Sequence, residues 1–286
     1  MAYADNIRPL RPTDEARPRV QFETINPASW DGKEVPRREW MVEGAIVKGS
    51  VCLIAGDGGI GKSLAMQQLC TCAALGRPWL GLSCQPGRAL FFGCEDDRDE
   101  LWRRQYDICR SLGRTLGDVG EAGLELAPRV GFDNTLSRLD RKEWKMVVTD
   151  LFLRLAEKCQ QMGINYVVID TATQTFGGNQ NDEQQVVQFC NQLRRLAVAI
   201  QGCVIITKHP SVAGRALGTG ESGSVSWNNS VRSRMYLHRD KEDRTILKTM
   251  KNNYGRIGEI IPLRWERGCF LRDKPETQSG SWGYRD

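Results

Sequence analysis

The stretch from residue 55 to residue 67, AGDGGIGKSLAMQ, places four glycines, a lysine and a serine directly after an apolar run. Its spacing G-x-x-x-x-G-K-S is that of a P-loop, in which backbone N–H groups surround phosphate oxygens at the start of a helix. In such a loop Lys62 is expected to hold the β- and γ-phosphates of ATP, and Ser63 a Mg²⁺ ion. The predicted nucleotide-binding residues are Gly56, Asp57, Gly58, Gly59, Ile60, Gly61, Lys62, Ser63 and Leu64.

A glycine-rich turn without a ligand is the alternative interpretation of this stretch. The flanking residues argue against it. Residues 51 to 55 (VCLIA) predict a buried strand and residues 63 to 75 a helix. The order strand, loop, helix is the context that a P-loop requires.

Two carboxylates follow other predicted strands. Asp170 ends YVVID, the position from which a Walker B aspartate assists the Mg²⁺ ion. Hydrolysis also needs a base for the attacking water, and Asp170 is followed by Thr171 rather than by a glutamate. Glu95, at the end of FFGCE, is therefore the predicted base. The acids after it are interpreted as charges at a helix N-terminus: Asp96, Asp97 and Asp99.

Two polar segments and a histidine follow strands of the same predicted sheet. His209 comes after ITK and is a candidate sensor of the γ-phosphate, although a surface or core histidine stays possible. Residues 171 to 182 and 211 to 230 are polar connectors, the second being long for a compact domain. Facing a common axis, the two connectors would form the lining of a binding site.

The whole sequence limits the class of protein. With 286 residues and 40% hydrophobic residues it can form one large core. Ten cysteines without a C-x-x-C pair, beside only two histidines, predict small core residues in a reducing compartment and no structural metal. No apolar run approaches membrane-spanning length and the start is not signal-like, so a cytoplasmic location without membrane contact is expected.

Strand and helix patterns alternate along most of the chain. Strands are predicted at residues 51 to 55, 88 to 94, 165 to 170 and 202 to 207, a short one near 124 to 126, and helices at 63 to 75, 97 to 112, 141 to 162 and 183 to 200. Residues 233 to 239, 245 to 251 and 259 to 266 predict antiparallel strands. The fold class is therefore α/β: a RecA-like P-loop core with a mostly parallel twisted sheet flanked by helices, and antiparallel strands toward the C-terminus.

Composition predicts three parts and one charged region. Residues 1 to 40, rich in Pro and Arg, are expected to be a flexible extension, residues 41 to 270 the ATPase domain, and residues 271 to 286 a polar tail. The net charge is +5, and residues 203 to 256 carry ten Lys or Arg against four Asp or Glu. Such a region fits a polyanionic partner or a solvated face.

The motifs together resemble the RecA-like AAA_25 ATPases, whose best-known members are the RepA-type hexameric plasmid helicases. The resemblance covers about residues 36 to 265. It rests on PRREW, GDGGIGKS, FFGCED, YVVIDT, ITKH, SGSVSWNNSVRSRMYL and MKNNYG. No second large domain, no primase zinc site and no counterpart for the segment before Pro36 is found, and Lys208 precedes the sensor histidine.

The resemblance implies a ring of subunits with ATP between neighbours and single-stranded DNA in a central channel. It makes Arg232, in NSVRSR, the arginine finger that reaches the neighbour's γ-phosphate, with Arg234 as second choice. Lys251, Asn253 and Tyr254 would lie near the nucleotide or the subunit seam.

The leading hypothesis is thus an ATP-dependent DNA helicase or translocase of plasmid, phage or mobile-element replication, forming a homo-hexamer or another ring, with replication proteins as further partners. Lys208 and Arg215 are the candidate DNA contacts. A DNA-stimulated ATPase that acts as a clamp, recombination mediator or regulator without unwinding is the alternative. A small-molecule kinase is weaker, because no arginine-rich lid follows the P-loop.

Overall fold

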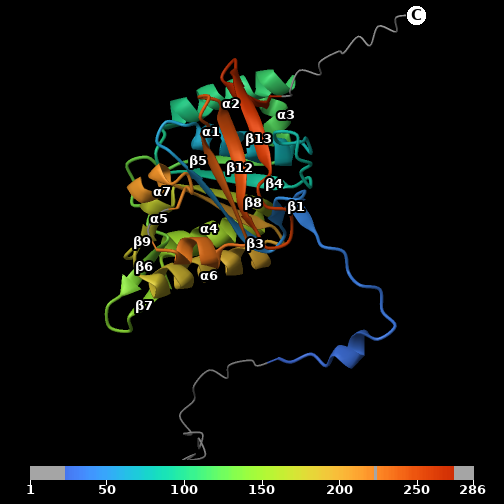
Figure 1. The fold of residues 1–286 in the computed structure, drawn as a ribbon, viewed down its shortest axis with the longest axis vertical. Helices are drawn as coiled ribbons and strands as arrows, with labels where there is room; N and C mark the ends of the chain where they lie inside the picture. The colour runs from blue at the N-terminus through green and yellow to red at the C-terminus, as the bar shows by residue number, and fades with distance from the viewer. Residues whose placement is uncertain (1–22, 222–223, 274–286) are drawn as a thin grey trace, which may run out of the picture. The chain divides into compact units, whose positions relative to one another are not determined.

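The computed structural model describes residues 23–221 and 224–273 (Figure 1). The chain divides into two units, residues 1–37 and 38–286. In the first unit the described residues are all exposed, and η1 (Pro27–Trp30) begins after Asn26, whose side chain accepts a hydrogen bond from the N–H of Ala28. Residues 1–22 of the predicted extension and 274–286 of the predicted tail lie outside the described residues.

A nine-stranded sheet forms the centre of the second unit, in the order β14-β13-β12-β11-β3-β10-β8-β4-β5. The six strands from β11 to β5 are parallel to their neighbours, and β12 to β14 are antiparallel. The predicted fold class is confirmed. The strands are β3 (Ser50–Gly56), β4 (Arg88–Gly93), β5 (Leu124–Pro128), β8 (Ile164–Asp170), β10 (Cys203–Lys208), β11 (Ser233–Arg239), β12 (Thr245–Asn252), β13 (Ile260–Glu266) and β14 (Cys269–Arg272).

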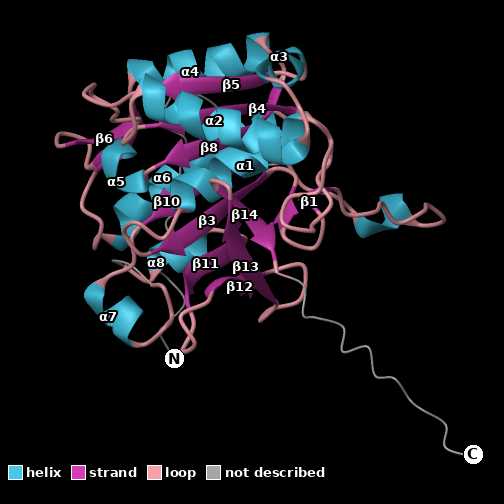
Figure 2. Ribbon diagram, turned by 90° about the horizontal axis from the view of Figure 1, so that it is seen from above, coloured by secondary structure: helices cyan, strands magenta, loops and turns pink. Residues whose placement is uncertain are grey.

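The parallel strands are apolar runs because both of their faces are covered. Along β8, Tyr166 and Val168 join one core, whereas Val167 and Ile169 join the other. The first core includes side chains of α1 (Lys62–Ala74), α2 (Arg98–Leu112) and α3 (Leu116–Glu121). The second includes those of α4 (Asp150–Gln161), α6 (Glu183–Ala199) and α8 (Ser226–Ser230), so the sheet lies between two helical layers (Figures 1 and 2).

Two small sheets and two short helices complete the fold. β1 (Trp40–Val42) pairs with β2 (Ile46–Val47). β6 (Ser137–Asp140) pairs with β7 (Lys145–Val148) and with β9 (Phe176–Gly177). α5 (Ala172–Thr175) and α7 (Val212–Ala216) lie in the two predicted polar connectors. Among the helices of the described residues, none has the length and apolar character needed to cross a bilayer.

The predicted helix at residues 141 to 162 is wrong in its first half. Residues 137–148 form the hairpin β6–β7 instead, and only α4 is helical. Tertiary bonds override the helical spacing: the N–H of Met146 donates to Gln188 Oε1 at 2.6 Å, and Gln192 Nε2 donates to the Met146 carbonyl at 2.8 Å. Thr149 caps α4, which explains why the helix begins there.

Candidate nucleotide-binding site

The P-loop joins β3 to α1 as its sequence context predicts. Gly59 and Gly61 have φ angles of 73° and 96°, which favour glycine. At Gly61 a Cβ would also stand 2.6 Å from the Phe270 ring, and at Gly56 it would stand 2.8 Å from the Leu237 carbonyl oxygen. The bare backbone of this loop is therefore required by its own turn and by the strands β11 and β14 that pack against it.

The loop lines a cleft of about 1110 Å³. Residues 57–64 of the loop form one wall of it, together with Glu95, His209 and Arg215. A cleft of this size accommodates a nucleoside triphosphate. The remaining lining residues were not predicted from the sequence. They come from α2 and the residue Asp96 before it, from Gly218 after α7, and from the strands β11 to β14 with the turn between β13 and β14. These residues are Asp96, Glu100, Arg103, Arg104, Asp107, Gly218, Tyr236, His238, Arg239, Thr245, Trp265, Gly268 and Phe270.

Lys62 is the first residue of α1, directly after the glycines of the loop, and its side chain is buried. Its amine donates to the carbonyls of Gly56 and Asp57, each at 2.8 Å, and lies 3.3 Å from His209 Nδ1. Burial lowers the pKa of this amine, whereas Asp170 and Glu95 oppose the shift. The amine is thus bonded to two carbonyls of its own loop, with the carboxylates of Asp170 and Glu95 nearby. A phosphate bound in the loop can replace these carbonyls as its partner.

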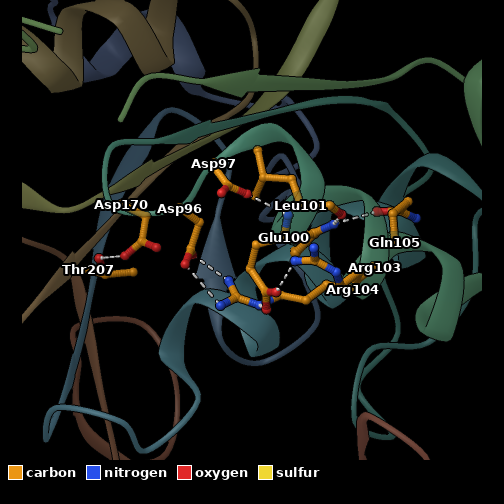
Figure 3. A network of polar contacts seen from close by, with 10 residues as sticks. Asp96, Asp97, Glu100, Leu101, Arg103, Arg104, Gln105, Asp170 and Thr207 are labelled. Atoms are coloured by element: carbon orange, nitrogen blue, oxygen red, sulfur yellow. Dashed lines mark hydrogen bonds and ion pairs between the residues drawn. The ribbon is translucent and has the colours of Figure 1, made fainter. Parts of the chain in front are cut away.

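Asp170 ends β8 beside the loop and is fully buried. Its Oδ1 accepts a hydrogen bond from the Thr207 hydroxyl, while its Oδ2 has no partner among the described residues (Figure 3). A buried carboxylate oxygen without a donor fits a cation, and Mg²⁺ prefers oxygen ligands. The half-buried hydroxyl of Ser63, in the first turn of α1, is the other predicted ligand.

No cluster of three His, Cys, Asp or Glu side chains suited to a metal occurs in the part of the chain that the structure describes. This agrees with a Mg²⁺ ion held by one carboxylate, one hydroxyl and the phosphates of its nucleotide. Thr207, which orients the carboxylate, was not predicted as a site residue. It lies inside the ITKH motif, so its place at the end of a strand beside β8 was the available signal.

Glu95 and His209 face each other across the cleft. His209 Nε2 lies 4.0 Å from Glu95 Oε1, and both side chains are partly exposed. Burial and the Asp170 charge raise the pKa of Glu95, and burial and the Lys62 charge lower the pKa of His209. A carboxylate of raised pKa is a stronger base. The structure thus places Lys62, Asp170, Glu95 and His209 close together, and their roles in hydrolysis stay a prediction.

The acids after Glu95 have structural partners. Asp97 caps α2 by accepting from the Glu100 N–H at 2.8 Å, and Asp96 forms a bidentate pair with Arg104 at 2.5 and 3.1 Å (Figure 3). The helix N-terminal role is confirmed for Asp97, whereas Asp96 instead fixes an arginine that lines the cleft.

The two predicted DNA contacts lie in different environments. Lys208 is 2% exposed; its amine donates to Gln180 Oε1 at 2.5 Å and lies 4.7 Å from the centre of the Trp227 ring. Arg215 is exposed but lines the cleft, with Nε 4.0 Å from Asp57 Oδ1. The Lys208 side chain is therefore buried in this structure rather than exposed to a DNA strand. The exposed Arg215 of α7 neighbours the P-loop, and its contact with DNA stays a prediction.

Gln180 joins the two polar connectors. Its side-chain Oε1 accepts from the Lys208 amine, and its backbone carbonyl accepts from the Trp227 indole at 3.3 Å and from the Ser224 N–H at 3.1 Å. The connector at 171 to 182 is thus bonded both to the strand that precedes His209 and to the connector at 211 to 230. This residue was missed, because nothing in the sequence ties a single glutamine to segments so far along the chain.

The residues predicted as the arginine finger and its surroundings lie at the opposite edge of the sheet: Arg232, Lys251 and Tyr254. Arg232 donates its backbone N–H to Val51 at the start of β3, and Lys251 pairs with Arg234. From Val51 to Gly56 the strand β3 advances by five residue steps, a rise of about 17 Å. Arg232, Lys251 and Tyr254 are therefore absent from the cleft of their own chain.

The two arginines of this group differ in their partners. Arg234 is 4% exposed; it donates to the Thr219 carbonyl at 2.9 Å and lies 4.0 Å from Glu221. Over the described residues, the half-buried Arg232 guanidinium makes no hydrogen bond or ion pair. Lys251 donates to the Asn228 carbonyl, and the Arg38 guanidinium lies over the Tyr254 ring, 4.8 Å from its centre.

Comparison with known proteins gives one match. A family model described as an AAA domain, AAA_25, matches residues 16–215, which is more than half of the chain. No curated protein matches the sequence. The matched range includes the P-loop, Glu95, Asp170 and His209, and it ends before Arg232.

Proposed function

The chain belongs to the AAA_25 family of P-loop ATPases, and we propose that it is a RepA-type helicase that hydrolyses ATP between the subunits of a ring and thereby moves single-stranded DNA. One observation carries this proposal. The P-loop cleft lies at one edge of the sheet, while the backbone of Arg232 lies at the other edge beside Val51, a strand rise of about 17 Å from Gly56. Its guanidinium makes no hydrogen bond or ion pair with the described residues. A guanidinium so placed cannot serve its own P-loop, but it can serve that of a neighbour.

The proposed chemistry assigns each residue one task. The loop N–H groups and Lys62 would bind the phosphates, and Ser63 and Asp170 would hold a Mg²⁺ ion, which would supply positive charge beside the phosphates. Glu95 accepts the proton of the attacking water, for which its raised pKa suits it. Arg232 of a neighbouring subunit would stabilise the transition state, a contribution worth orders of magnitude in rate.

His209 and Gln180 offer a route from the phosphate to the connectors. His209 lies within 3.3 Å of the Lys62 amine, and the preceding residue is bonded to Gln180. A displacement of His209 upon hydrolysis would therefore move both connectors together. These connectors are the proposed DNA-contacting elements, since they leave the same edge of the sheet as the P-loop.

A complementation experiment tests the subunit-shared site. The variants Glu95→Gln and Arg232→Ala are each expected to lose nearly all turnover, by 10³-fold or more for an arginine finger. In a one-to-one mixture about a quarter of the interfaces would combine an intact pocket with an intact arginine, restoring about a quarter of the parental rate. A mixture that stays inactive would refute the sharing. Arg256→Ala, at an exposed turn, is the matched control.

A second assay separates the helicase from the alternative. Duplex unwinding and DNA-stimulated ATP turnover are measured in parallel on the full chain. Displacement of a labelled strand that depends on Glu95 supports the helicase. Stimulated turnover without displacement supports the clamp, mediator or regulator instead.

A further inference from the structure

The hairpin β6–β7 presents an exposed tryptophan on a rigid support. Trp144, at its tip, has 70% of its surface exposed and a φ angle of 51°, which is rare for a bulky residue. An exposed tryptophan alone needs no explanation, because most protein surfaces contain apolar atoms. The position of Trp144, the support beneath it and its charged neighbours together do need an explanation.

The support comes from α6 and from within the hairpin. Met146 is 5% exposed, and both of its backbone polar groups bond to glutamine side chains, Gln188 at 2.6 Å and Gln192 at 2.8 Å. The Ser137 hydroxyl donates to the Val147 carbonyl at 3.1 Å. The backbone that follows Trp144 is thus fixed by these bonds before any ligand arrives, which lowers the entropy cost of ordering the hairpin on binding.

Basic residues flank Trp144 in the turn of the hairpin. Arg141, Lys142 and Lys145 are exposed around the tip. Of the acids in the turn, Asp140 accepts the Lys142 N–H at 2.8 Å, so it stabilises the turn itself, and Glu143 pairs loosely with Lys145 at 3.8 Å. The tip therefore combines a flat aromatic face with an excess of positive charge.

The hairpin also belongs to the edge that carries the two polar connectors. β6 pairs with β9, Arg138 lying beside Gly177, and β9 leads directly into the segment that contains Gln180. Figures 1 and 2 both show β6 on the side of the molecule where α5 and α7 lie. A strand of nucleic acid that follows the connectors would pass this hairpin.

We propose that the tip of the hairpin, residues 141 to 145, is a binding site for single-stranded DNA, in which one base stacks on Trp144 while Arg141 and Lys142 contact the flanking phosphates. Aromatic faces beside cationic groups bind single strands in this way, with little dependence on sequence. The inference rests on the proposed function, and it adds a contact outside the two connectors. It also accounts for the exposed, strained position of Trp144.

The test measures binding of fluorescently labelled oligo-dT by the full chain with a non-hydrolysable ATP analogue. Loss of one stacked base costs about 1–3 kcal/mol, so Trp144→Ala should weaken binding about 5- to 150-fold, and Trp144→Phe should retain part of it. The double variant R141A/K142A should lower the slope of log affinity against log salt by about 1.4. Trp102→Ala, which removes a comparably exposed tryptophan from α2, should bind as the parent does.

Circular dichroism and thermal melting confirm that each variant folds. If the parent binds oligo-dT and Trp144→Ala binds it equally well, the hairpin site is refuted while the helicase proposal stands. If Trp144→Ala binds equally well but sediments as smaller assemblies than the parent, the hairpin is a subunit contact, which also refutes the site. If the parent hydrolyses ATP without binding DNA, both proposals fail.

Discussion

The buried amine of Lys208 gives a prediction that tests the interior of the fold. Burial lowers the pKa of this amine from 10.5 to about 8. Its contacts are the Gln180 amide and the Trp227 ring, and over the described residues it has no carboxylate partner. Each unit of pKa shift corresponds to about 1.4 kcal/mol. Keeping this amine charged in the interior therefore lowers the free energy of unfolding by about 3 kcal/mol.

The pH dependence follows from proton binding. Below pH 8 the amine is protonated in both the folded and the unfolded state, so the free energy of unfolding is lowered by the full amount. Between about pH 8 and pH 10.5 the unfolded chain binds more protons than the folded one, so the free energy of unfolding rises with pH. From about pH 7.5 to about pH 9.5 this amine alone should add about 2 kcal/mol.

The variant Lys208→Met isolates that contribution. Other groups also titrate in this range, so the quantity of interest is the difference in free energy of unfolding between the parent and the variant. Urea denaturation at a series of pH values should show this difference shift by about 2 kcal/mol in favour of the parent as pH rises. Lys241→Met, which removes an exposed amine from the β11–β12 turn, is the control. A difference that is constant with pH would refute the buried, charged amine.

Three further predictions concern the cleft. Gly61→Ala places a methyl group against Phe270 at a positive φ, so ATP affinity should fall about tenfold in a fluorescent-nucleotide titration, whereas unchanged affinity would contradict the packing. Thr207→Val removes the donor to Asp170, so half-maximal turnover should need at least about tenfold more Mg²⁺, and an unchanged requirement would separate Thr207 from the metal. Because the pKa of Glu95 is raised, kcat/KM should rise with pH through a midpoint above the ordinary carboxyl range, and a midpoint at or below that range would count against Glu95 as the base.

The catalytic edge was predictable because it depends on short patterns. A buried parallel strand is an apolar run, and the residue after it lies at the carboxyl edge of the sheet. Glu95, Asp170 and His209 are all placed by this rule, as is the loop before Lys62. Element order alone therefore locates these residues near one another without any knowledge of side-chain contacts.

The rest depends on contacts between distant segments. The side chain of Gln68, in α1, bonds to the backbone of Phe270, 202 residues away, which brings β14 over the P-loop. Lys208 follows an apolar strand like the other edge residues, yet its side chain turns inward to Gln180. The spacing of apolar residues predicts helix over residues 141 to 148, because it does not reveal that α6 binds the backbone at Met146.

The position of β11 beside β3 bears on where this protein can be cut. The family match ends at residue 215, before β11 begins. A fragment trimmed to that range would leave one side of the P-loop strand unpaired and remove the aromatic wall near Gly61. Unpaired strands of this kind invite association with other chains. The recognisable family segment is thus expected to aggregate on its own, and its solubility to return only when the strands through β14 are included.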